Sequence, residues 1–390
     1  KNLDINVIDL QIDSAAYSTY VNKSSENHQS DRENITRQLL FADDLRVRVR
    51  DYQIDMGDTA YLAKADLISL STKNPRLEIS GFSLVPQVPR SIYKDMFPFQ
   101  KTRVMAQTEM VRLSGVDFEE LINNRYLKGQ SLLIDGVQLD VFKDARAPRD
   151  TKRTLPMHQE MLTDLGFQLT LDTVRVANGF VNYAERVPDA SQDGIITFDE
   201  LHALLQNVTN HPDHIADSVI FSMEVGAEVM GQGKLKAAFE FPMASEDMHF
   251  TVSGKLDSMD LQALNPIMEN AAFVHIRDGD ANSMRFFIQG DRQRSSGEMR
   301  FNYNDLSVML VDKNKGRPGI DERVGSLFAN AFVVKSDNPK AVFFRVGEID
   351  YEHDSSRSIF SYWWRSLLSG IKSSIGMDRV AERVREEKDQ

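Results

Sequence analysis

Apolar and polar residues alternate along much of this chain, which is the pattern of half-buried β-strands. The segment 45–50 alternates strictly, with a leucine and two valines on one face and three arginines on the other. The arginine face fits either a solvated surface or a strip that binds anions. Further strands are expected at residues 61–69, 76–84, 102–113 and 132–142, with a short helix at 118–124.

One strand phrase recurs in the first half of the chain. Residues 132–142 and residues 169–176 carry similar runs of leucine, valine and aspartate, and residues 5–12 carry a looser copy. Such recurrence is typical of an architecture that grows by adding similar strands. The pattern therefore favours a long β surface that binds along its length over a single enclosed catalytic pocket.

The strand pattern strengthens after residue 218. Short turns rich in glycine, asparagine and aspartate separate these strands, which predicts an antiparallel meander. A sheet of this kind must cover its apolar face with a second layer, by curling on itself, or with a ligand. The expected strands are residues 219–229, 233–241, 249–256, 272–277, 283–290, 297–303, 306–311 and 342–351.

The segment 358–375 has the period of an amphipathic helix instead. Two interpretations stay open: the helix docks on the sheet as a lid, or it contacts a membrane surface or a partner protein. Tryptophan next to basic residues is typical of the membrane interface. The candidate contact residues are Trp363, Trp364, Leu367 and Leu368.

Composition narrows the class of protein. The chain has 390 residues, and its 58 acidic residues exceed its 46 basic residues, giving a net charge of −12. This balance argues against nucleic acid as a partner, because phosphate binding needs concentrated lysine and arginine. The absence of cysteine excludes disulfides, thiolate catalysis and zinc–thiolate sites, and it fits an oxidising compartment. No apolar run approaches the roughly 18 residues that a membrane-spanning helix needs.

The segment 189–200 matches part of a calcium-binding loop, with Asp189, Ser191, Asp193 and Glu200 at ligand positions. However, Pro188 directly precedes it, the residues before it alternate like a strand, and no second loop appears. The favoured interpretation is two strands joined by an acidic turn, so we expect no metal. No phosphate-binding loop, nucleophile motif or paired acid and base is evident, so we expect neither an enzyme nor a cofactor.

Several phrases in a fixed order resemble the AsmA-like family of bacterial envelope proteins, the relatives of TamB and YhdP, and in particular its Bacteroidetes-type members. These phrases lie at residues 174–185, 194–198, 201–210, 250–256, 261–266, 276–279, 297–306, 329–332 and 360–372. The resemblance covers residues 169–376 well and the first 150 residues loosely.

The resemblance implies an extended, curled antiparallel sheet with a few short helices and a C-terminal amphipathic helix. It also implies a periplasmic body, held by an inner-membrane anchor that precedes Lys1, whose apolar inside carries phospholipid between the two membranes. An alternative is a structural scaffold that holds other envelope proteins. The family supplies no catalytic residues.

On this basis the chain divides into an N-terminal β-repeat region (1–150), a second repeat (151–218), a β meander (219–356) and a helix with a charged tail (357–390). Residues 145–155 form the best linker candidate because they are polar and contain Pro148. The candidates for lining a lipid groove are Leu235, Phe239, Phe241, Phe287 and Val342.

Overall fold

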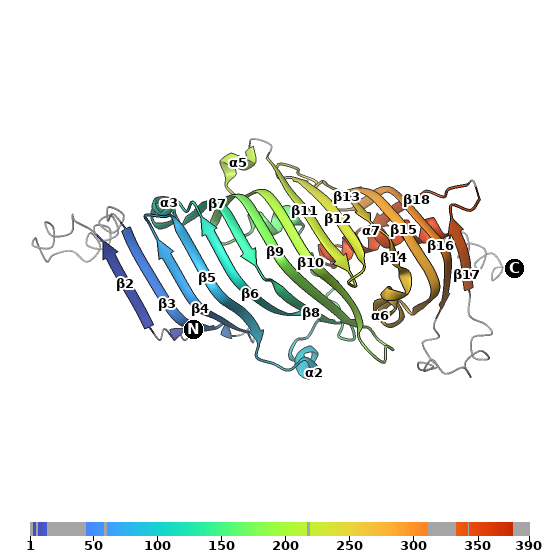
Figure 1. Cartoon of the computed structure of the whole chain (residues 1–390), viewed down its shortest axis with the longest axis horizontal. Helices are drawn as coiled ribbons and strands as arrows, with labels where there is room; N and C mark the ends of the chain where they lie inside the picture. Colours follow the sequence, from blue (N-terminus) through green and yellow to red (C-terminus); the bar gives the residue numbers. More distant parts are fainter. Residues whose placement is uncertain are drawn as a thin grey trace, which may run out of the picture.

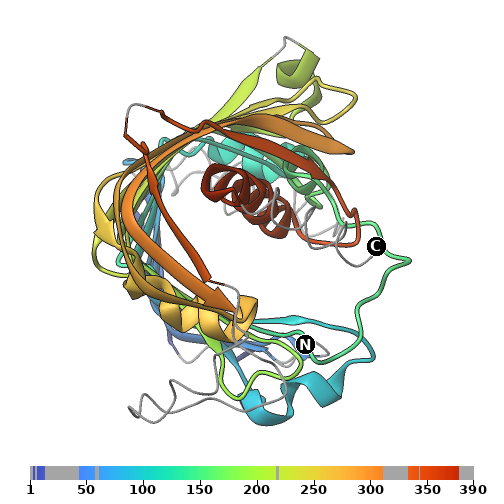
Figure 2. The same ribbon diagram turned by 90° about the vertical axis from the view of Figure 1, so that its right-hand side faces the viewer.

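The computed structural model describes residues 3–4, 7–13, 44–57, 61–216, 219–310, 333–341 and 343–376. The predicted fold class is confirmed: the protein is mainly β, with a few short helices and a C-terminal helix. Its strands lie side by side in one long sheet, which Figure 1 shows from its convex side. Seen along its length in Figure 2, the sheet curls around the C-terminal helix.

The strands are β1 (Leu3–Asp4), β2 (Val7–Asp13), β3 (Asp44–Asp55), β4 (Tyr61–Ser71), β5 (Arg76–Pro86), β6 (Thr102–Ser114), β7 (Tyr126–Asp135), β8 (Gln138–Asp144), β9 (Gln168–Arg186), β10 (Gly194–Thr209), β11 (Ile220–Val229), β12 (Gly233–Pro242), β13 (Phe250–Leu256), β14 (Met259–Asp260), β15 (Val274–Gly290), β16 (Arg294–Leu310), β17 (Val333–Asn338) and β18 (Gly347–Glu352). The helices are α2 (Arg90–Tyr93), α3 (Phe118–Asn124), α4 (His158–Thr163), α5 (Pro212–Ala216), α6 (Asn265–Ile267) and α7 (Ile359–Ile375), with further helical turns at Lys94–Met96, Leu261–Leu264 and Met268–Ala272.

The strands follow one another across the sheet in chain order. β3 to β6 pair as antiparallel neighbours, as do β9 to β13, β15 and β16. β7 and β8 continue one another along the same side of β6, and β17 and β18 both pair with β16. The regions predicted from the sequence meet near residues 150 and 218. The strands on the two sides of each boundary are hydrogen-bonded to one another, β8 to β9 and β10 to β11.

One pairing departs from the expected antiparallel order. β7 and β8 lie parallel to β9, with Leu132 beside Val174. The two copies of the recurring strand phrase are therefore on neighbouring parallel strands. A parallel pair needs a crossover connection, since the chain must return to the edge where it started. Residues 145–167, which contain the predicted linker and α4, make this crossover.

A line of residues with left-handed backbone conformation crosses the N-terminal and central strands and explains why the sheet curls. Asp51, Gly81, Gly136, Asn178 and Glu200 all have φ between 50° and 67°, and the ladder register skips or shifts at each of them. Such β-bulges bend a strand and increase its twist. Because each bend lies next to the bend of the adjacent strand, the whole sheet folds along one line.

The helix α7 covers the C-terminal end of the concave face and lies against β18. Hydroxyl groups on the helix accept hydrogen bonds from the outer edge of that strand: Glu348 N donates to Ser373 Oγ (3.0 Å) and Asp350 N to Ser369 Oγ (3.2 Å). The predicted lid interpretation therefore describes the position of this helix. The helix also provides hydrogen-bond partners for backbone N–H groups that an uncovered sheet edge would leave unpaired.

Several sequence expectations need correction in detail. The strands expected at 272–277 and 283–290 are parts of the single bulged strand β15, which starts at Val274, and those expected from 297 and from 306 are parts of β16, which ends at Leu310. Turn-forming residues inside these segments mark bulges and not chain reversals. The strand expected at 342–351 begins only at Gly347.

Because α7 lies in close contact with the sheet, adding a single methyl group at Gly370 should lower the stability of the protein. A Cβ at Gly370 would lie 2.6 Å from Ile349 Cγ1, although glycine-to-alanine changes inside helices usually stabilise them. We therefore expect Gly370→Ala to lower the free energy of unfolding by about 1–3 kcal/mol, because the core must shift. Urea unfolding would measure this, with Lys372→Ala on the same helix as the control. A Gly370→Ala protein as stable as the parent would contradict the packing described.

Candidate ligand groove

Two unbroken rows of apolar side chains run along the concave face, across the strands. In each row, every residue is directly paired with the next, so all of its side chains share one face of the sheet. The first row is Val47, Leu70, Leu77, Leu113, Leu132, Val174, Leu205, Met223, Phe239, Val252 and Ile288. The second row is Val49, Ile68, Ile79, Val111, Ile134, Val176, Ala203, Val225, Ala237, Gly254, Phe286 and Met299.

The two ends of these rows differ in how well they are covered. In the N-terminal half, residues such as Ile68, Ile79 and Ile134 are only half-buried. At the C-terminal end, under α7, Ile288 is 1% exposed and Met299 is fully buried. The apolar face is thus a packed core at one end and a partly open surface at the other.

The middle of the second row carries small side chains, and we call the stretch of Ala203, Val225, Ala237 and Gly254 the trough. A hollow of about 750 Å³ at this level of the sheet is lined by these residues and also by convex-face neighbours such as Lys236, Ala238 and Lys255. The ring of Phe286 lies over Gly254 and closes the trough toward the C-terminal end, where a Cβ at Gly254 would come within 2.2 Å of that ring.

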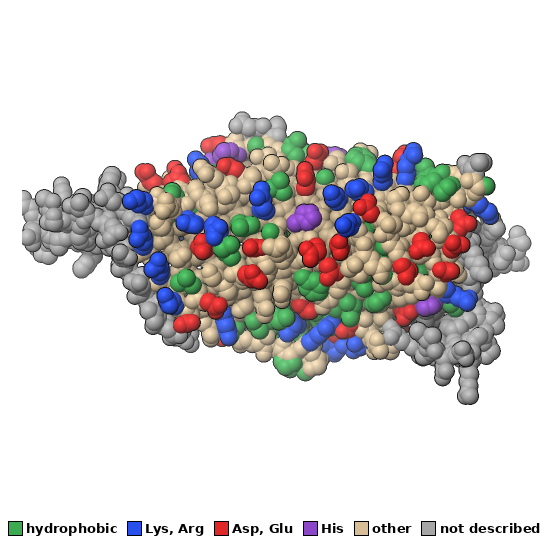
Figure 3. Space-filling view, in the orientation of Figure 1, with side chains coloured by type: hydrophobic (Ala, Val, Ile, Leu, Met, Phe, Trp, Pro, Cys, Tyr) green, Lys and Arg blue, Asp and Glu red, His purple; other side chains and the backbone are tan. Residues whose placement is uncertain are grey.

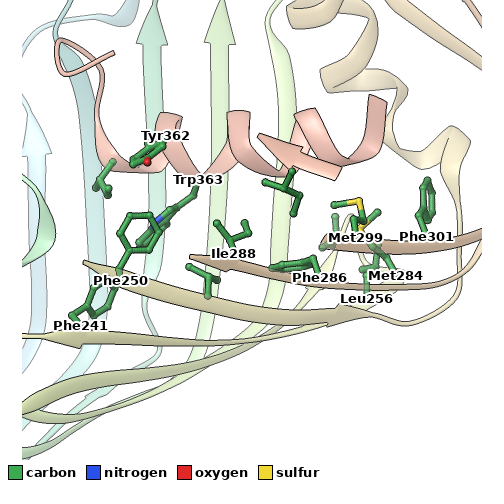
Figure 4. Packing of buried hydrophobic residues seen from close by; sticks show 14 of the residues in the cluster. Phe241, Phe250, Leu256, Met284, Phe286, Ile288, Met299, Phe301, Tyr362 and Trp363 are labelled. Carbon is green, nitrogen blue, oxygen red and sulfur yellow. The ribbon is translucent and has the colours of Figure 1, made fainter. Parts of the chain in front are cut away.

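From β12 onward, α7 and the aromatic residues around it fill part of the concave face. Figure 4 shows Tyr362 and Trp363 projecting from the helix near Phe241 and Phe250. The Trp363 ring lies 4.6 Å from the ring of Phe239, and the Tyr362 ring is 5.6 Å from that of Phe250 in an edge-on arrangement. Such contacts add to the free energy of burying the rings.

A histidine joins this cluster from the crossover segment. The His158 ring stacks on Trp363 at 4.4 Å and on Phe241 at 4.6 Å, so it lies between two aromatic rings. Burial lowers the pKa of His158 to about 4, because the charged imidazolium loses its hydration there. At neutral pH the histidine is therefore an uncharged part of the aromatic cluster.

Residues 145–157 of the crossover span the open side of the curled sheet, from one rim to the other. We call this segment the strap, and Figure 2 shows it on the open side. At one rim Gln100 holds it, donating from N to Pro148 O (2.9 Å) and from Nε2 to Ala147 O (2.8 Å). Toward the other rim, Arg149 pairs with Asp354 (2.8 Å) and Leu155 N donates to Ser355 O (2.8 Å). The strap therefore ties together two rims that the sheet itself keeps apart.

The bidentate ion pair between Arg292 and Glu160 anchors α4 at the end of this strap. Arg292 Nη2 and Nη1 donate to Glu160 Oε1 (2.6 Å) and Oε2 (3.0 Å), and these bonds lower the pKa of Glu160. The predicted linker is thus held at several points along its length.

The residues predicted to line a groove lie in different places in the structure. Leu235 and Phe239 lie half-buried on the concave face, and Phe241 is fully buried under His158. Phe287 is a correction: it pairs with Ser253 and Glu298 on the convex face and is 48% exposed, because its neighbours Phe286 and Ile288 take the inward positions. Val342 lies outside the described residues.

The predicted contact residues of α7 divide between two sides of the helix. Trp363 is a correction, since it is only 9% exposed and belongs to the core. Trp364 is 43% exposed and Phe360 is 66% exposed on the side away from the sheet, while Leu367 and Leu368 are half-buried. The sequence showed one apolar stripe, but only part of it packs on the sheet.

The segment resembling a calcium loop is a hairpin connection, as the favoured interpretation expected. β9 runs to Arg186 and β10 starts at Gly194, while Glu200 lies inside β10. The Asp193 carboxylate accepts hydrogen bonds from Arg186 Nε and Arg90 Nη2 (2.6 Å). This aspartate ties α2 to the hairpin.

Sequence reasoning missed the rows, the trough and the strap. The alternation of each strand was visible, but the rows depend on pairing registers that the sequence does not display. A scan against protein-family models finds no match to this chain, and a search of curated proteins finds none either. Within the part of the chain that the structure describes, no helix combines the length and apolarity needed to cross a membrane.

The two tryptophans should differ strongly in their contribution to stability. Trp363→Ala removes a ring packed against four aromatic side chains, and we expect a loss of about 3–5 kcal/mol in the free energy of unfolding. Trp364→Ala, its exposed neighbour, serves as the matched control and should cost less than about 1 kcal/mol. Equal losses in urea unfolding would show that α7 does not dock as described.

The low pKa of His158 predicts a loss of stability in mild acid. The ordinary pKa of 6.5 applies in the unfolded chain and about 4 in the folded protein, so below pH 6.5 the unfolded state binds more protons. Between pH 7 and pH 4 this difference in pKa costs about 3 kcal/mol of stability, and we expect His158→Phe, which keeps a stacking ring, to remove that loss. Thermal unfolding of both proteins across this range measures the difference. Parallel pH profiles would argue against a buried neutral histidine.

Proposed function

We propose that this protein binds the acyl chains of phospholipids along its concave face, as a non-enzymatic AsmA-like protein of the cell envelope. The observation that carries the proposal is the pair of apolar rows that run along the curl, half-buried over the N-terminal half of the sheet and leading into the trough. The periplasm is the proposed location, in keeping with the absence of cysteine.

The direction of the rows is what suits an acyl chain. Strands are spaced about 4.8 Å apart, so a row that crosses the strands offers apolar contact continuously along the curl. Transfer of each methylene group from water to such a surface contributes about 0.8 kcal/mol. Affinity can therefore accumulate along the chain without any single strong contact, and the backbone groups beneath are already paired within the sheet.

The small residues in the trough give space that the flanking rows lack. Ala203, Ala237 and Gly254 lie between larger residues in the same row, and Phe286 ends the space. An acyl chain along this stretch would contact Val176 and Val225 as well as the two alanines, because all four belong to one row. The C-terminal end, filled by α7, is not part of the proposed binding surface.

A pair of neighbouring alanines gives a matched test. By the alternation of β12, Ala237 lies in the trough on the concave face, whereas Ala238 faces the convex side, where it is exposed. We expect Ala237→Glu to reduce the phospholipid that co-purifies with the protein at least fivefold, because a carboxylate in the trough opposes burial of hydrocarbon. Ala238→Glu should leave the amount unchanged. Lipid extraction and mass spectrometry of the purified proteins give the lipid-to-protein ratio.

A second variant separates blockage from misfolding. Ala237→Leu fills the trough without adding charge, so it should also reduce bound lipid while keeping the melting temperature within a few degrees. If the parent protein carries no phospholipid, or if all three variants carry as much as the parent, the lipid-binding proposal is wrong and the scaffold alternative is favoured.

A further inference from the structure

A row of cationic side chains runs along the convex face, on the opposite side of the sheet from the trough. Lys236 is paired directly with Lys255, Lys255 with Arg285, and Arg285 with Arg300. All four are exposed. We call these four residues the basic row. Figure 3 looks onto this face, where blue and red side chains are interspersed.

A histidine continues the basic row two strands further, across a glycine. His202 pairs with Gly226, which in turn pairs with Lys236. The exposed ring lies over Gly226, where a Cβ would come within 2.3 Å of His202 Nε2. Six successive strands of the sheet therefore present a basic side chain, or a glycine covered by one, at the same level.

Like charges directly opposite one another destabilise a sheet, and here three such pairs follow in sequence. The protein has a net charge of −12, so the row is not a consequence of general basicity. Among the ion pairs of the described residues, one involves the row, between Lys255 Nζ and Asp257 Oδ1 at 3.5 Å. An anionic ligand would relieve this repulsion.

The surroundings of the row restrict the shape of that ligand. Acidic residues flank it on the same face, two positions along the strands: Glu224, Glu228, Asp257 and Glu298. A flat anionic membrane would meet these carboxylates as well as the cations. A narrow, linear polyanion would meet the cations alone.

Spacing and an exposed ring favour a glycan among linear polyanions. The cations recur about every 4.8 Å, the distance between strands. A sugar unit has a length close to the strand spacing. Phe287, which is 48% exposed, lies two residues from Arg285 on the same face and offers a flat apolar surface for a sugar ring.

We propose that the basic row binds a linear anionic polysaccharide that carries an acidic group on each sugar, with Phe287 stacking against one of the rings. This proposal does not depend on lipid binding in the trough, because the two surfaces lie on opposite faces of the sheet. In this proposal, the basic row attracts the negative charges of the polysaccharide, and Phe287 makes the site prefer a sugar chain to other polyanions.

The test uses the full chain and polygalacturonate, a polysaccharide with a carboxylate on every sugar. We expect binding that weakens with salt, and the double variant Lys255→Glu, Arg285→Glu should weaken it at least tenfold. The matched control Lys64→Glu, Lys152→Glu changes net charge by the same amount at two exposed positions away from the row, and should bind within twofold of the parent. Phe287→Ala should weaken polygalacturonate binding about threefold and leave its salt dependence unchanged.

Three probes separate the alternatives in the same binding measurement. Neutral dextran, polyglutamate and phosphatidylglycerol vesicles should each bind at least tenfold more weakly than polygalacturonate. Absence of polygalacturonate binding, equal or tighter binding of polyglutamate or vesicles, or equal losses in the row and control variants would each overturn the proposal. Melting temperatures of all variants establish that they are folded.

Discussion

The bend that crosses the strands is the constraint on which the remaining structure depends. A flat sheet of these strands would expose its apolar rows to water along their whole length, and a twisted sheet without bulges would not wrap around a helix. The left-handed residues from Asp51 to Glu200 place the bend at neighbouring positions. One consequence is a concave side that can be covered by a single helix at one end, while the other end keeps a partly open apolar surface.

The two faces of the same strands carry different chemistry because side chains alternate. Along β12, Ala237 belongs to the trough, whereas Lys236 and Ala238 point to solvent on the convex side. Directly paired residues on neighbouring strands lie on the same face of the sheet. An apolar residue or a lysine in one strand therefore becomes part of a row that crosses the strands. The proposed lipid surface and the proposed polysaccharide surface therefore arise from one set of registers.

Much of the fold could be predicted from the sequence, since alternation and turn residues identify strands locally. The helix Phe118–Asn124 and the amphipathic helix near the C-terminus were also visible in the residue pattern. The face of each residue was harder to predict. Phe287 was assigned to the concave side, but it follows the inward Phe286, and a one-residue change of register reverses every side chain in a strand. The parallel pairing of β7 and β8 with β9 depends on long-range contacts, which repetition of a phrase does not reveal.

The strap has a topological consequence for anything that occupies the concave side beneath it. Because the strap leaves β8, bonds to both rims and returns to β9, the strap and the sheet together form a hoop around the concave side at this level. A long, slender molecule could slide through such a hoop end-on. Lateral escape would first require the contacts of Gln100, Arg149 and Leu155 to break. For such a molecule, the free-energy barrier to movement along the concave side would thus be much lower than the barrier to leaving it sideways.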